Sequence, residues 1–138
     1  MLATDLVHEA YNNLILLRSI FRQRYINAPN NRQKEQMHTC FEELAKIPSE
    51  PPEVPWPLQS VEVEWNAPDV LTHQNPEKTT AARRMMLSIR MLDDAVAAFD
   101  KAELHTEYQD TLRKLADHLA RNVCVTIFHA ECPREVIR

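Results

Sequence analysis

Residues 75–99 read NPEKTTAARRMMLSIRMLDDAVAAF, and this stretch decides the fold class. Asn75, Pro76 and Glu77 predict a helix start, because asparagine caps helices, proline suits the first helical position and a carboxylate favours the positive helix end. Apolar residues then recur at spacings of three and four, as on one side of a helix. They are Ala82, Met85, Ile89, Leu92, Val96 and Phe99. Such a stripe is stable only when covered, so the chain is expected to supply further helices.

The same spacing predicts three more helices. The first spans about residues 4–26 and the second about 32–47, which Pro48 ends because the residue before a proline avoids helical geometry. Thr106 to Gln109 match a capping box and begin the last helix. Its stripe is Tyr108, Leu112, Leu115, Leu119 and Val123, and the stripe of the first helix is Val7, Ala10, Leu14, Leu17 and Phe21.

These patterns predict an all-α fold, a bundle of about four helices in one domain over residues 1–138. Residues 1–47 form a helical pair, residues 79–132 form a helical hairpin, and residues 48–78 connect them. Further apolar residues widen the surface of the first helix and suggest self-association, so a homo-oligomer is one expectation. These residues are Leu6, Ile15, Leu16 and Ile20.

The connector, residues 48–78, is rich in proline and acidic, with six carboxylates and one lysine. Dense proline predicts an extended, irregular segment. Residues 60–65 alternate with period two, which places Val61, Val63 and Trp65 on one face of a strand. No partner strand is predicted within the chain. The segment is therefore expected to cover the chain's own helices or to join the exposed sheet edge of another protein.

The connector also carries both tryptophans, which are frequent anchors of protein interfaces. We expect Trp56 and Trp65 to act as aromatic anchors and Glu62 and Glu64 as an acidic rim for a protein partner. The predicted function is a small, non-enzymatic interaction module: a subunit, adaptor or inhibitor of a larger assembly.

Composition excludes several other functions. The chain has no glycine, which phosphate-binding loops and dinucleotide-binding turns require. Its three cysteines lack CxxC spacing, the N-terminal residues lack a secretion-signal pattern, and no apolar run reaches membrane-spanning length. These features predict a cytoplasmic protein with reduced thiols and no membrane partner.

Two metal-binding patterns are incomplete, so neither a metal nor another cofactor is expected. His129 and Glu131 have the spacing of a zinc deaminase motif, but the downstream cysteine pair is missing. Glu35 and His38 have the spacing of a di-iron half-site, but the second Glu-x-x-His is missing.

Two alternatives involve nucleic acid. Arg113 and His118 are spaced as in the arginine-histidine signature of HEPN ribonucleases, and the six-residue stretch resembles that family. The resemblance implies a dimeric helical bundle that cleaves RNA without metal, with both side chains at the dimer interface. Separately, Arg18, Arg22 and Arg24 could form a basic patch that contacts nucleic acid within a ribonucleoprotein complex, although the net charge of −4 disfavours a free-standing nucleic-acid binder.

Overall fold

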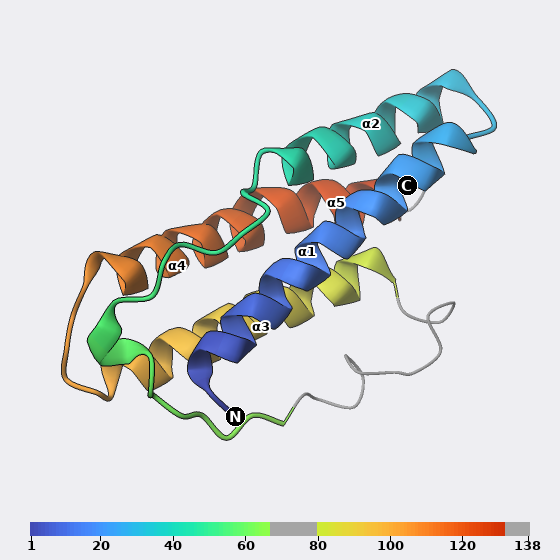
Figure 1. Ribbon diagram of the computed structural model, residues 1–138. Coiled ribbons are helices and arrows are strands. Elements are labelled where there is room, and N and C mark those ends of the chain that lie inside the picture. The colour runs from blue at the N-terminus through green and yellow to red at the C-terminus, as the bar shows by residue number, and fades with distance from the viewer. Residues whose placement is uncertain (67–79, 132–138) are drawn as a thin grey trace.

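Helices α1 (Ala3–Ile26) and α3 (Ala81–Asp100) pack along each other in a helical bundle (Figure 1). The computed structural model describes residues 1–66 and 80–131. Helix α2 (Asn31–Ala45) packs on α1, and the last rod of the bundle packs on both α3 and α2. One hydrophobic core takes side chains from every helix. The predicted all-α bundle is therefore confirmed.

The fourth predicted helix is a single rod with an irregular middle. It comprises α4 (Glu107–His118), a π-helical turn (Leu119–Val123) and α5 (Cys124–Glu131). A π turn contains more residues than an α turn. The wider turn offsets the gradual rotation that repeated spacings of four residues produce in an α-helix, so Leu119, Val123 and Ile127 stay on one buried face.

The α3 stripe differs in part from the prediction. Met85, Leu92, Val96 and Phe99 are buried, but Ala82 and Ile89 are only half-buried. The reason is that α1 and the α4–α5 rod both cover α3, so the buried surface is wider than one stripe and is shifted around the helix. It also includes Ala81, Ser88, Met91 and Ala95.

Local side chains fix the helix starts. Thr80 is extended and its hydroxyl accepts a hydrogen bond from the N–H of Arg83 (3.1 Å), so α3 begins at Ala81. Asn75 and Pro76, the predicted start, lie outside the described residues. Thr106 and Gln109 form the predicted capping box of α4. In the turn before it, Glu103 has a φ of 60°, in the left-handed region that glycine usually occupies.

The connector from Pro48 to Asn66 is irregular, with a bend at residues 49–50, a 3-10 turn, η1 (Trp56–Leu58), and a further turn at residues 59–60. The prediction that residues 60–65 lack a partner in this chain is wrong. They run antiparallel to the N-terminal residues, with a bridge between Leu2 and Glu62 (Figure 1). Val61, Val63 and Trp65 face the helices, as the alternation predicts, and are half-buried against the core.

The predicted self-association surface on α1 is only partly exposed. Leu6 is completely buried, so it cannot belong to the predicted self-association surface on α1, whereas Leu16 is 44% exposed. Within residues 1–66 and 80–131, no helix combines the length and the apolar character that a bilayer crossing requires.

Candidate protein-binding site

Trp56 projects from the η1 turn with 82% of its surface exposed. Proline precedes and follows it, and the turn is closed by hydrogen bonds from the N–H of Leu58 to the carbonyl of Pro55 (2.9 Å) and from the N–H of Gln59 to the carbonyl of Trp56 (3.2 Å). Leu58 is completely buried and anchors the turn in the core. The backbone beneath the indole is therefore held in place while the indole faces solvent.

Glu62 and Glu64 lie a few residues further on, and both are exposed on the solvent side of the extended segment. Their positions follow from the alternation, because the intervening valines face the helices. Residues 48–66 carry four glutamates and no lysine or arginine. Trp56 is thus exposed on an acidic segment, and its role as an anchor for a protein partner stays a prediction.

Trp65 has a different environment from Trp56. It is half-buried, and its indole N–H donates a hydrogen bond to a carboxylate oxygen of Asp94 in α3 (2.8 Å). Arg90 contacts the same oxygen at 3.3 Å. Trp65 therefore fastens the connector to α3, and its polar group is already paired. Of the four predicted binding residues, it is the one that the fold uses internally.

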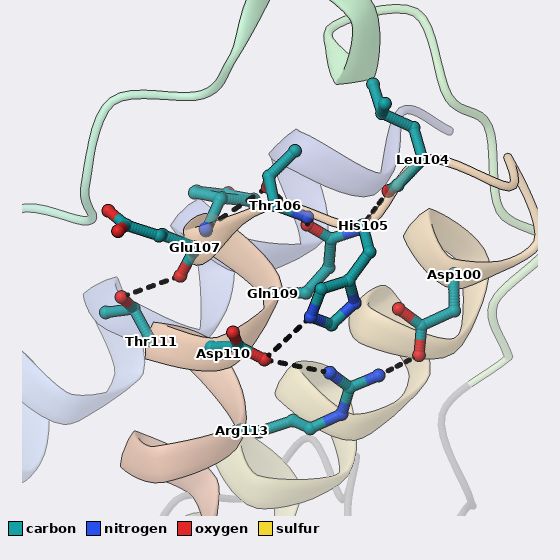
Figure 2. A network of polar contacts seen from close by, with 10 residues as sticks. Asp100, Leu104, His105, Thr106, Glu107, Gln109, Asp110, Thr111 and Arg113 are labelled. Atoms are coloured by element: carbon teal, nitrogen blue, oxygen red, sulfur yellow. Dashed lines mark hydrogen bonds and ion pairs between the residues drawn. The ribbon is translucent and has the colours of Figure 1, made fainter.

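Arg113 and His118 belong to separate polar networks. Figure 2 shows the guanidinium of Arg113 directed at the carboxylates of Asp100 and Asp110, both within ion-pair distance. His118 instead contacts the side-chain amide of Asn122 at 3.0 Å on the next turn. No hydrogen bond within the described part of the chain joins Arg113 to His118. The ribonuclease activity stays a prediction, which an RNA-cleavage assay with His118→Ala would test.

The ion pairs around Arg113 connect α3 with α4. Asp110 also contacts Nε2 of His105 at 3.1 Å, so one carboxylate bridges the turn before α4 and the helix itself (Figure 2). The side chain of Arg113 is 44% exposed, and such surface ion pairs contribute little stability individually. The network links the end of α3 to the first turns of α4.

The three arginines of α1 do not form one open patch. Arg24 pairs with Glu131 (3.1 Å) and lies over the ring of Phe21, and Arg18 donates a hydrogen bond to the hydroxyl of Ser49 (3.3 Å). Arg22 is exposed. Nucleic-acid contact by these residues stays a prediction.

Glu131 has a role that sequence reasoning missed. Its carboxylate accepts hydrogen bonds from the N–H groups of Ala81 and Ala82 (2.9 Å each), at the start of α3, while it pairs with Arg24 of α1. A carboxylate at a helix N-terminus satisfies unpaired N–H groups and the helix dipole. No local spacing could reveal this, because the partners lie 49 and more residues away.

Among the described residues, the two incomplete metal motifs do not bring metal ligands together. The His38 imidazole pairs with Glu42 (3.2 Å) rather than with Glu35. Across residues 1–66 and 80–131, no group of three or more histidine, cysteine, aspartate or glutamate side chains is placed to hold a metal ion.

Burial suppresses the reactivity of Cys40 and Tyr108. Burial raises the pKa of the Cys40 thiol to about 12, and the nearby Glu131 carboxylate adds to the shift. Burial also raises the pKa of Tyr108, chiefly by desolvation. Neither group is available as a nucleophile or a proton carrier near neutral pH.

No protein-family model, no curated protein and no solved structure matches this chain.

Proposed function

We propose that this protein is a small, non-enzymatic, cytoplasmic interaction module that docks onto another protein through Trp56, as a subunit, adaptor or inhibitor of a larger assembly. One observation carries the proposal: a tryptophan is 82% exposed on a turn whose backbone is fixed. Glu62 and Glu64 are exposed on the same connector. The proposal keeps the cytoplasmic location that the cysteine pattern predicts.

Physical chemistry favours binding through such a residue. An indole offers a large apolar area, and its transfer from water into a pocket is favourable. The 3-10 turn and its prolines have already fixed the backbone, so docking loses little conformational entropy. Tryptophan is also the residue type most enriched among energetic hot spots of interfaces.

The surroundings of Trp56 define the partner's chemistry. Four glutamates and no cations lie within residues 48–66, so the complementary surface is an apolar pocket with a basic rim. Rim charges of this kind mainly accelerate association and confer specificity, whereas the buried aromatic residue supplies most of the affinity.

The test is affinity capture from native host lysate, with and without nuclease, using the wild-type chain and Trp56→Ala. We expect a stoichiometric protein partner that survives nuclease and that Trp56→Ala binds roughly 30-fold more weakly, the loss typical of an interface hot spot. Phe128→Ala is the matched control, because Phe128 is an aromatic residue of α5 that is 52% exposed.

Retention of every partner by Trp56→Ala would overturn the proposal. Recovery of RNA or DNA, or loss of the partner on nuclease treatment, would do the same and would favour the alternatives that involve Arg113, His118 and the α1 arginines.

A further inference from the structure

Among residues 1–66 and 80–131, the extended segment after η1 has hydrogen-bond partners along one edge and none along the other. The N–H of Ala3 donates to the carbonyl of Val61 (2.9 Å), and the N–H of Val63 donates to the carbonyl of Met1 (2.9 Å). The N-terminal amino group also donates to the carbonyl of Val63 (3.2 Å). The carbonyl of Val61 and both backbone groups of Val63 are therefore directed towards the N-terminal residues, whereas the N–H of Val61 donates to the carbonyl of Leu58 (3.2 Å).

The backbone N–H and C=O groups of Glu62 and Glu64 form the opposite edge. In an antiparallel pair, the N–H and C=O groups of successive residues point in opposite directions within the sheet. Leu2 and Glu62 form the non-hydrogen-bonded position of this pair, so the backbone groups of Glu62 point away from the N-terminus, and those of Glu64 follow. These groups form no hydrogen bond with residues 1–66 or 80–131. An edge of this kind is a template for another strand.

We propose that the partner engages this edge by strand addition: an extended segment of another protein pairs with Glu62 and Glu64. Main-chain hydrogen bonds would supply affinity and the side chains would supply specificity, as in other cases of β-augmentation. This inference rests on the proposed function, because it assigns the mode of binding to the connector that also carries Trp56.

The charge of the edge selects the occupant. The side chains of Glu62 and Glu64 are exposed on the solvent face of the segment, where they oppose the residues of an added strand. Like charges placed directly opposite are unfavourable, so acidic strands and further copies of this edge are rejected. A strand with lysine or arginine at alternate positions is accepted, and its cations satisfy both carboxylates.

The probe is a capped octapeptide in which lysine alternates with valine, titrated into the full-length, isotopically labelled protein and followed by amide chemical shifts and hydrogen exchange. We expect saturable shifts centred on residues 60–65, new protection of the Glu62 and Glu64 amides, and at least tenfold weaker binding in high salt. The matched peptide in which glutamate alternates with valine should not bind.

Two substitutions separate the backbone from the charge. Glu62→Pro removes the outward N–H, and proline is tolerated where an edge N–H faces solvent, so the fold and melting temperature are expected to persist while binding falls at least tenfold. Glu62→Ala keeps the N–H and removes the charge, so it should bind more weakly than wild type but better than Glu62→Pro.

Three results would overturn strand addition: equal binding by Glu62→Pro and Glu62→Ala, binding without protection of the Glu62 and Glu64 amides, or no binding of the lysine peptide. Glu62→Pro is also carried through the lysate capture. If Trp56→Ala loses the partner and Glu62→Pro retains it, the proposed function stands and strand addition fails. If both variants retain the partner, both proposals fail.

Discussion

Glu131 joins three helices through one carboxylate, and its side chain is only 14% exposed. Replacement by alanine leaves the first N–H groups of α3 and the guanidinium of Arg24 without their partner. Hydrogen bonds to charged groups contribute about 1.5–3 kcal/mol each, and water partly compensates those at the surface. We expect Glu131→Ala to lower the free energy of unfolding by about 2–3 kcal/mol, measured by urea denaturation.

Glu35 provides the control for this experiment. It is exposed, and its carboxylate forms no hydrogen bond or ion pair with a described residue. Glu35→Ala is expected to change stability by less than about 0.5 kcal/mol, as is usual for surface substitutions. Equal effects of the two substitutions would show that Glu131 does not hold the helices together.

Cys40 gives the fold a dependence on alkaline pH. Its pKa rises from 9.0 to about 12 on folding, because burial disfavours the thiolate. The unfolded chain therefore loses this proton first as the pH rises, which favours unfolding. The contribution of Cys40 to stability is full below pH 9 and is lost progressively towards pH 12.

The measurement is urea denaturation of wild type and Cys40→Ala at several pH values between 8 and about 11. Wild type should lose stability more steeply than the variant across this window, although the variant is less stable at pH 8 because it leaves a small cavity. If wild type and Cys40→Ala lost stability equally with rising pH, Cys40 would not be the source of the pH dependence. Thiol labelling at pH 8 should also spare Cys40 until the chain unfolds.

The contact between α1 and α3 depends on a small polar pair. Ser88 is completely buried; its hydroxyl accepts a hydrogen bond from the side-chain amide of Asn13 (2.7 Å), which also donates to the carbonyl of Arg84 (2.6 Å). The hydroxyl also donates a hydrogen bond to the carbonyl of Ala10 (3.4 Å). We expect Ser88→Ala to lower the free energy of unfolding by about 1–2 kcal/mol through the two lost hydrogen bonds. Ser88→Leu should cost about 1–3 kcal/mol more, because the helices are too close for a larger side chain.

Urea denaturation of both variants tests this packing, with Met86→Ala as the control because Met86 is half-exposed on the same helix. A tolerated leucine would mean that the two helices can move apart at this point.

Ser88 also shows what the sequence alone does not predict about a helix. The apolar stripe predicts the helix, but a buried serine becomes intelligible only when the second helix is in place.

Across the whole molecule, the connector ties the helices together at three points. Trp65 forms a hydrogen bond with Asp94 of α3, and Leu58 packs in the core. Residues 61–63 form backbone hydrogen bonds with the N-terminal residues. Trp65→Ala removes both the packing and the hydrogen bond to Asp94. We expect faster cleavage between residues 48 and 66 in limited proteolysis while the helical circular dichroism persists; Trp56→Ala should leave the cleavage rate unchanged.

Sequence periodicity was sufficient for the helices but not for these links. Spacings of three and four residues report which side of a helix is apolar, and the alternation at residues 60–65 correctly predicts which side chains face inward. The pairing of Glu62 with Leu2, the bond from Trp65 to Asp94 and the function of Glu131 join residues that are distant in the chain. No local pattern encodes such partners.

For the candidate site, the sequence singled out Trp56, Trp65 and the two glutamates of the connector, and their binding to a protein partner stays a prediction. It could not distinguish Trp56 from Trp65, because both lie in the same proline-rich connector and differ only in what the fold places beside them.

Glu103 is the one residue within 1–66 and 80–131 that has a positive φ. Every other described position therefore has a backbone geometry that ordinary L-amino acids adopt readily. In a saturation mutagenesis library, tolerance should follow side-chain burial almost everywhere. Position 103 should stand apart, with glycine and asparagine outperforming the native glutamate in abundance and β-branched residues depleted.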